Sequence, residues 1–295
     1  AYVLVVEKEH SYGRGCSSRN SEVIHSGIYY PTASLKHKLC VKGRRMLYDY
    51  LTKKQIPYDR CGKLIIATGT DELDALERLS QQAEENGIEN VAKLTKDQVL
   101  KLEPDINVTA ALLSKETGIF DTHSFMKSLV SAIGNKCGTI LYSNEVVSLD
   151  YDYDADAYSL SLSDGTSFSS EYVINSGGLF ATQISKFLGI EPVRLYPCKG
   201  DYFSYIGVHR CRHLIYPVPH KSLTGLGVHA TIDLNGRLKF GPDAEYIDNI
   251  ADYTVSADKR EHFFQSAKKI FKDIKYDELS PDMAGIRPKI QGPND

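Results

Sequence analysis

The stretch SSRNSEVIHSGIYYP, residues 17–31, links a hydrophobic run to a long amphipathic one. Hydroxyl, amide and glycine residues dominate it, and such loops are common as simple surface connections. The flanking sequence favours a ligand-binding loop instead. The run YVLVVE at 2–7 precedes it as an apolar strand, and the segment 33–54 follows it with the period of a helix. We therefore expect a loop that is held between a strand and a helix and grips a polar ligand.

The run YVLVVEKE together with this loop resembles the second strand and following flavin-contacting loop of the D-amino-acid oxidase-like FAD oxidoreductases. Within that superfamily, the segments IHSGIYYP, LKHKLCVKGRRMLYDY and CGKLIIAT are most similar to the L-2-hydroxyglutarate dehydrogenases. The resemblance spans almost the whole chain. It implies FAD as cofactor and an α/β fold, in which a Rossmann-like FAD-binding domain adjoins a mixed, largely antiparallel substrate domain.

The resemblance also predicts how the chain divides into domains. Residues 1–60, 118–195 and 280–295 are expected to form the FAD-binding domain, and residues 61–117 and 196–279 the substrate domain. The glycine-rich turn of such domains should precede the acidic end of the second strand by about 20 residues or more, whereas the sequence begins at Ala1. The first strand and this turn are therefore expected to be missing, and both ends to be truncated relative to the family.

Composition narrows the class of protein. The chain has 295 residues, of which 42% are hydrophobic and 25% charged, as in ordinary globular enzymes. A formal net charge of -3 and the lack of a cluster of basic residues argue against nucleic acid as a partner. The six cysteines have no metal-site spacing, so no metal is expected. No apolar stretch has the length of a transmembrane segment.

Several residues are candidates for contact with FAD. Glu7 closes the first strand, where a carboxylate binds the ribose hydroxyls of a dinucleotide, although a surface carboxylate would look the same. Apolar residues 172–175 are expected to form a strand of the same sheet, and the glycines after it permit close approach to a phosphate or flavin, or form a plain tight turn. The residue matching Val146 in the family contacts adenine, and core packing is the alternative. The resemblance implies FAD contacts from Glu7, Ser17, Ser18, Arg19, Asn20, Ser21, Val146, Ser176, Gly177 and Gly178.

Other residues are candidates for substrate chemistry. His25 and His229 titrate in the range of a general base, although a lone histidine in a sheet is often only structural. Arg287 lies in a Gly-Ile-Arg-Pro segment, and its guanidinium fork suits a carboxylate unless it is a surface arginine on a turn. The resemblance favours the first role. The other end of a substrate is expected to contact Lys199, Tyr202 or Tyr216.

The sequence thus predicts FAD-dependent oxidation of L-2-hydroxyglutarate, a small dicarboxylate, with an unidentified electron acceptor. Two alternatives remain. One is a related flavoenzyme that acts on an amino acid or on glycerol 3-phosphate, and the other is a non-catalytic fragment that no longer retains FAD. The resemblance implies a mitochondrial location if the source is eukaryotic, and otherwise a cytoplasmic or membrane-peripheral one.

Overall fold

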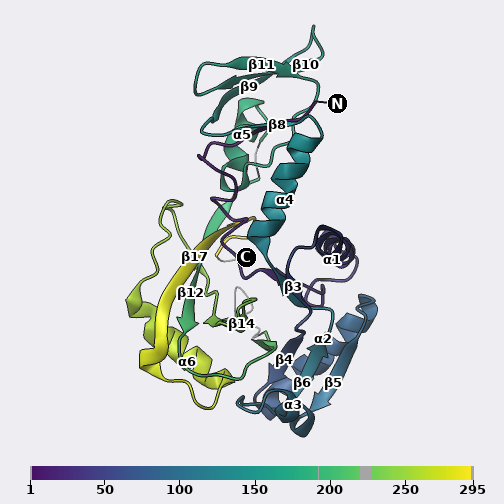
Figure 1. Cartoon of the computed structure of the whole chain (residues 1–295), viewed down its shortest axis with the longest axis vertical. Helices are drawn as coiled ribbons and strands as arrows, with labels where there is room; N and C mark the ends of the chain where they lie inside the picture. The colour runs from purple at the N-terminus through teal and green to yellow at the C-terminus, as the bar shows by residue number, and fades with distance from the viewer. Residues whose placement is uncertain (1, 192, 220–226, 294–295) are drawn as a thin grey trace.

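The computed structural model describes residues 2–191, 193–219 and 227–293 (Figure 1). Its largest element is a nine-stranded sheet in the order β16-β12-β15-β14-β13-β4-β6-β5, with β17 paired to β12. The neighbouring strands of this sheet pair in antiparallel fashion, except for β13 and β4, which are parallel. The strands are β4 (Lys63–Ala67), β5 (Val91–Thr95), β6 (Ala110–Ser114), β12 (Tyr196–Tyr205), β13 (Leu214–Pro217), β14 (Ala230–Ile232), β15 (Leu238–Phe240), β16 (Glu245–Tyr246) and β17 (Leu279–Lys289).

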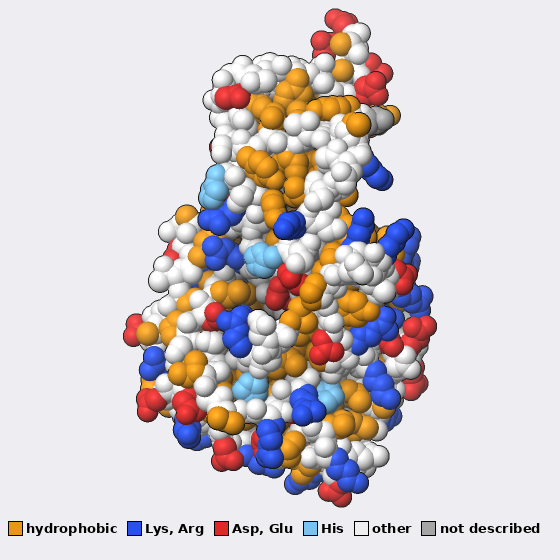
Figure 2. Space-filling view, in the orientation of Figure 1, with side chains coloured by type: hydrophobic (Ala, Val, Ile, Leu, Met, Phe, Trp, Pro, Cys, Tyr) orange, Lys and Arg blue, Asp and Glu red, His pale blue; other side chains and the backbone are white. Residues whose placement is uncertain are grey.

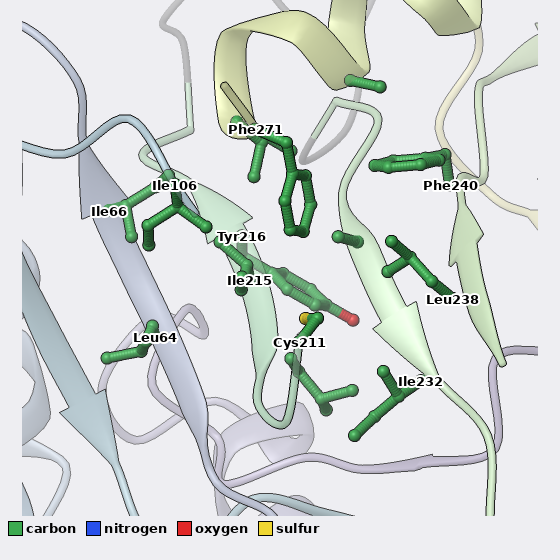
Figure 3. Packing of buried hydrophobic residues seen from close by; sticks show 14 of the residues in the cluster. Leu64, Ile66, Ile106, Cys211, Ile215, Tyr216, Ile232, Leu238, Phe240 and Phe271 are labelled. Atoms are coloured by element: carbon green, nitrogen blue, oxygen red, sulfur yellow. The ribbon is translucent and has the colours of Figure 1, made fainter. Parts of the chain in front are cut away.

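Strand β4 lies inside this sheet and is buried along its whole length. Because side chains alternate along a strand, Leu64 and Ile66 join one apolar cluster and Ile65 and Ala67 join another. The first cluster includes residues of α6 and the second includes residues of α2. Figure 3 shows the first cluster, in which the Tyr216 ring extends from β13 toward β15. The covering helices are α2 (Leu73–Glu85), α3 (Lys96–Leu102) and α6 (Arg260–Ile270).

A smaller α/β unit occupies the other end of the molecule (Figure 1). Its β1 pairs in parallel with β8, which confirms the strand predicted within 2–6. The turn at 163–166 joins two antiparallel strands, β10 and β11. Hydrophobic side chains gather on the surface at this end (Figure 2). The elements are β1 (Leu4–Val6), α4 (Thr122–Asn135), β8 (Thr139–Leu141), β9 (Val146–Asp152), β10 (Ala157–Leu162), β11 (Ser167–Ser170), the 3-10 turn η2 (Gly178–Phe180) and α5 (Ala181–Phe187).

The strand predicted at 172–175 is wrong. This segment has no strand assignment, and Tyr172 and Ile174 are 82% and 87% exposed. β1 pairs only with β8 among the described strands. In the doubly wound fold another strand lies between the position of β1 and the position expected for residues 172–175. Residues 172–175 therefore do not pair directly with β1.

Helix α1 (Leu35–Lys54) begins at Ser34, whose hydroxyl accepts a hydrogen bond from the His37 amide at 3.2 Å. The sequence indicated an apolar stripe that includes Leu35 and Leu39, but both side chains are largely exposed. The helix instead buries Arg44, Tyr48 and Leu51, because Tyr48 and Leu51 pack with the core beside a three-stranded sheet. That sheet contains β2 (Val23–Ile24), β7 (Gly118–Phe120) and β3 (Tyr58–Asp59).

The loop before β2 lies directly against β17, so segments from the two ends of the chain meet. The Cys16 thiol donates a hydrogen bond to the Ile286 carbonyl at 2.9 Å. At Gly285 the two backbones approach so closely that a Cβ would lie 2.2 Å from the Arg19 carbonyl oxygen. Only glycine allows this contact without a shift of the backbone.

We expect Gly285→Ala to lower the free energy of unfolding by about 1–3 kcal/mol, because the added methyl group overpacks a backbone contact. Gly43→Ala is the matched control, since Gly43 lies inside α1 with nothing within 4 Å of its added Cβ. That change should stabilise the chain by about 0.5–1 kcal/mol. Urea unfolding of both variants measures the difference, and equal stabilities would contradict the close packing at Gly285.

Candidate active site

Two of the predicted site residues meet in an aromatic stack on the large sheet. The rings of Tyr216, on β13, and His229, which precedes β14, are 3.8 Å apart at an interplanar angle of 25°. Both residues are buried. The Nδ1 atom of His229 lies 2.9 Å from the Gly227 carbonyl oxygen, which can only accept a hydrogen bond. In the neutral imidazole Nδ1 therefore carries the proton, and Nε2 keeps a free lone pair.

The same group includes Lys63, which sequence analysis did not select. Its ammonium lies 4.5 Å from the centre of the Tyr29 ring and 4.7 Å from that of Tyr216. The side chain is fully buried at the start of β4. The sequence feature that could have pointed to Lys63 is a lysine at the start of the apolar run KLIIA. By sequence alone, however, such a lysine is interpreted as the charged end of a strand.

The two histidines are held in the neutral form. Burial, then the nearby charge of Lys63, lowers the pKa of His25 to about 3. Burial also lowers the pKa of His229 to about 3, because its effect exceeds that of the opposing hydrogen bond to Gly227, and the charges of Lys63 and Arg287 add smaller effects that also lower this pKa. The charge that His229 would carry also lowers the pKa of His25. Both can accept a proton at neutral pH.

Arg287 lies on β17, and its side chain is accessible. It donates a hydrogen bond from Nη2 to the Asp243 carbonyl oxygen at 2.9 Å. Its charge lowers the pKa of His229. Tyr202 is also close: it donates to or accepts from the Ser21 hydroxyl at 2.7 Å and thereby joins β12 to the predicted cofactor loop.

Lys199 is not brought into this group. Its ammonium donates hydrogen bonds to the Thr254 carbonyl oxygen at 2.5 Å and to the Asp252 carboxylate at 3.4 Å. Asp201 is 3.9 Å away and completes the ion-pair network. These contacts hold the Lys199 ammonium in a network of hydrogen bonds and ion pairs. Its role in substrate binding stays a prediction.

The predicted cofactor loop is organised by its own side chains. The Asn20 amide donates to the carbonyl oxygens of Cys16 and Ser17, and its Oδ1 accepts from the Glu22 amide. The Arg19 guanidinium stacks 4.0 Å above the Tyr253 ring. Ser17 is exposed, whereas the Ser18 hydroxyl donates to the Gly15 carbonyl oxygen at 3.4 Å. Asn20 and Ser21 therefore hold the loop in shape, which leaves the backbone of the loop and Arg19 to meet a ligand.

The remaining cofactor candidates gather at the end of β1. One Glu7 oxygen accepts a hydrogen bond from the Glu9 amide, and the Glu7 carbonyl accepts one from Asn144, two residues before Val146. The Lys8 ammonium lies 3.4 Å above the Phe180 ring and so joins this strand end to the glycine turn, where Gly178 has a positive φ of 55°.

The described residues fit a polar cofactor along this path. Three buried polar atoms on it have no hydrogen-bond partner among the described residues: Arg19 Nε, Ser26 Oγ and Asn144 Oδ1. Buried polar atoms are nearly always paired, so each calls for a partner beyond the described residues. FAD offers donors and acceptors along its whole length, which suits these three positions.

Comparison with known proteins agrees with this geometry. Residues 1–295 match the family described as FAD dependent oxidoreductase (DAO). The chain is 36% identical to the mitochondrial L-2-hydroxyglutarate dehydrogenase of Arabidopsis thaliana, over 99% of this chain and 69% of that protein. It is 27% identical to the glycerol 3-phosphate dehydrogenase of Caloramator mitchellensis, over 98% of this chain and 60% of that protein.

Among solved structures, the L-alpha-glycerophosphate oxidase of Mycoplasma pneumoniae with FAD bound matches with a TM-score of 0.90 at 25% identity. The match covers 99% of this chain and 78% of the oxidase chain. This chain therefore spans only part of the length of each of these relatives. The match to the family over every residue confirms the predicted resemblance: the chain belongs to the DAO family of FAD-dependent oxidoreductases.

Proposed function

We propose that the protein oxidises L-2-hydroxyglutarate to 2-oxoglutarate. One observation carries this proposal: the Nδ1 proton of the neutral His229 is held by the Gly227 carbonyl oxygen, so Nε2 keeps its lone pair, and the charge of Arg287 acts on the pKa of the same imidazole. A proton acceptor next to a carboxylate-binding guanidinium is what a 2-hydroxy acid requires. The similarity to the Arabidopsis dehydrogenase supports the choice of substrate.

The residues of the chain would act on the substrate as follows. The Arg287 guanidinium binds the carboxylate next to the hydroxyl, and Tyr202 and Tyr216 shape the buried wall of the site. His229 or His25 then takes the hydroxyl proton, and the negative charge of the bound substrate stabilises the imidazolium that forms. FAD, when bound, supplies the acceptor for the hydride from the hydroxyl-bearing carbon.

The cofactor roles and the division into domains belong to the same proposal. Residues 1–60, 118–195 and 280–295 would bind FAD, and residues 61–117 and 196–279 would bind substrate, with β17 crossing between them because it pairs with β12. Lys199 keeps its predicted role as a contact of the substrate in this proposal. The FAD contacts would come from Glu7, Ser17, Ser18, Arg19, Asn20, Ser21, Val146, Ser176, Gly177 and Gly178.

Glycerol 3-phosphate is the second candidate substrate, because two of the similar proteins are named for glycerol phosphate. Amino-acid oxidation and a fragment without FAD are the remaining alternatives. A mitochondrial location in a eukaryotic source is supported by the name of the Arabidopsis relative. Within the described residues, no helix has both the length and the apolarity to cross a membrane.

The proposal predicts a preference among substrates. Purified protein with FAD bound should reduce an artificial electron acceptor with L-2-hydroxyglutarate at least about tenfold faster, as kcat/KM, than with glycerol 3-phosphate or an amino acid, a difference equal to about 1.4 kcal/mol. Flavin absorbance of the same sample reports whether FAD is retained. A higher kcat/KM for glycerol 3-phosphate would replace the proposed substrate, and lack of flavin would favour the non-catalytic fragment.

Arg287→Lys should lower kcat/KM for L-2-hydroxyglutarate by at least about tenfold, because lysine keeps the charge but loses the two-donor fork. Most of the loss should appear in KM, and the flavin absorbance ratio should stay unchanged. Arg45→Lys is the control, since Arg45 is an exposed arginine of α1 that pairs with Glu89. Normal kinetics for Arg287→Lys would make Arg287 a surface residue, and loss of flavin would make it a cofactor residue.

The neutral state of His229 can be tested without an activity assay. The pKa of His229 falls from 6.5 to about 3 on folding, so between these values the unfolded chain binds more protons. Stability must then fall as pH falls from about 6.5. Between pH 7 and pH 5 this histidine should remove about 2 kcal/mol of folding free energy.

In the variant His229→Asn, the loss of stability between pH 7 and pH 5 should therefore be smaller than in the parent by about 2 kcal/mol. His10→Asn serves as the control, because His10 is exposed. Urea unfolding at the two pH values gives the comparison. Identical pH dependence in parent and His229→Asn would mean that His229 is not held neutral.

A further inference from the structure

Lys63 is a buried cation that pairs with no anion among the described residues. Its side chain is 0% exposed, and its Nζ has no hydrogen-bond partner among the described residues. The Tyr29 and Tyr216 rings on either side attract a cation weakly, by about 2 kcal/mol when desolvated. Removing an ammonium from water costs several kcal/mol more. The part of the chain that the structure describes therefore does not supply the hydrogen bonds and counter-charge that a charged Lys63 needs.

Lys259 shows how the same chain treats a lysine that it stabilises by itself. Its ammonium lies 2.6 Å from Asp201, 2.7 Å from Glu245 and 3.0 Å from Asp243. These carboxylates raise its pKa against the effect of burial. For Lys63, burial lowers the pKa to about 7. Lys63 can thus exist in either form near neutral pH, and a bound anion would decide which one prevails.

A second polar group beside Lys63 also lacks a partner. The Tyr29 hydroxyl is buried and forms no hydrogen bond with any described residue. Its ring is one of the two that contact the Lys63 ammonium. An ammonium and a hydroxyl, both buried and both with free donors, form a suitable pair for one carboxylate, which accepts several charge-assisted hydrogen bonds.

The position of Lys63 relative to the rest of the site matches a substrate with two anionic ends. The charges of Lys63 and Arg287 both lower the pKa of His229, and Lys63 also lowers that of His25. The neutral histidines thus have two cations near them, from β4 and from β17. A 2-hydroxy dicarboxylic acid has one carboxylate beside its reactive carbon and a second further along the chain.

We propose that Lys63, together with the Tyr29 hydroxyl, binds the second carboxylate of the substrate and so makes the site selective for dicarboxylic over monocarboxylic 2-hydroxy acids. This inference rests on the proposed function and deepens it. Arg287 then binds the carboxylate next to the hydroxyl, and Lys63 binds the distal one. A monocarboxylic acid has no second carboxylate to pair with Lys63, so it gains no binding energy from this residue.

Kinetics with two substrates of equal chain length test this selectivity. In the FAD-loaded protein, Lys63→Met should raise KM for L-2-hydroxyglutarate at least about tenfold, while kcat/KM for L-2-hydroxyvalerate changes less than about twofold. Tyr29→Phe, which removes only the hydroxyl, should raise KM for the dicarboxylate several-fold. Lys93→Met is the matched control, because Lys93 lies on the same sheet and pairs with Glu77 at the surface. Lys93→Met should leave KM and kcat/KM for both substrates unchanged.

Proton uptake gives a second measurement that needs no turnover. Glutarate, an unreactive dicarboxylate, should raise the pKa of Lys63, so its binding at pH 8 should take up close to one proton. Calorimetric titration in two buffers of different ionisation enthalpy measures this number. The other titratable groups that face Lys63 or interact with it are Tyr29, Tyr216, Cys40, His25 and His229.

The possible results separate the two proposals. Proton uptake in the parent that is lost in Lys63→Met supports the assignment, even if the parent fails to oxidise L-2-hydroxyglutarate and the proposed function fails. Glutarate binding without proton uptake in the parent overturns the assignment, whether or not Lys63→Met folds. An equal loss of activity of Lys63→Met with both substrates also overturns it, because that result indicates a structural role.

Discussion

The complete burial of β4 is the constraint on which the site depends. All five residues of the strand are buried, so the sheet must be covered on both faces. Leu64 and Ile66 help to form the core beneath α6, while Ile65 and Ala67 pack with Ile28 and α2. The alternation of side chains along β4 also places the Lys63 side chain in the interior. Once the strand is fixed in the sheet, its first residue cannot reach solvent, and the site acquires a cation that apolar packing alone would exclude.

Neutral bases surrounded by cations give the site its chemical character. Burial keeps the imidazoles of His25 and His229 uncharged, and the charge of Lys63 opposes their protonation further. Such a group is poorly suited to a neutral ligand. An anionic substrate reverses the balance: it pairs with the cations and favours positive charge on the histidine that takes a proton. Proton acceptance thus becomes favourable only when substrate is bound.

A close backbone contact holds the predicted cofactor loop against the nine-stranded sheet. Gly285 allows the Arg19 backbone to approach β17, and the Ser21 hydroxyl meets Tyr202 on the neighbouring β12. Arg287 follows Gly285 by two residues on the same strand. The loop that is expected to touch FAD and the strand that carries Arg287, the proposed carboxylate-binding residue, are therefore positioned by one interface. This arrangement couples the place of the cofactor to the place of the substrate.

Local sequence determined the elements and the family. The apolar run before Glu7 forms β1, the run KLIIA forms β4, and Ser34 caps α1, because strand and helix periodicity and capping act over a few residues. Motif resemblance identified FAD as the cofactor, and the titration range of histidine made His25 and His229 candidate bases. Only the tertiary structure decided that 172–175 stays unpaired, that Leu35 and Leu39 face solvent, and that Lys63 joins His229 and Tyr216. Burial and pairing depend on segments distant in the chain, and no local pattern records which of them will meet.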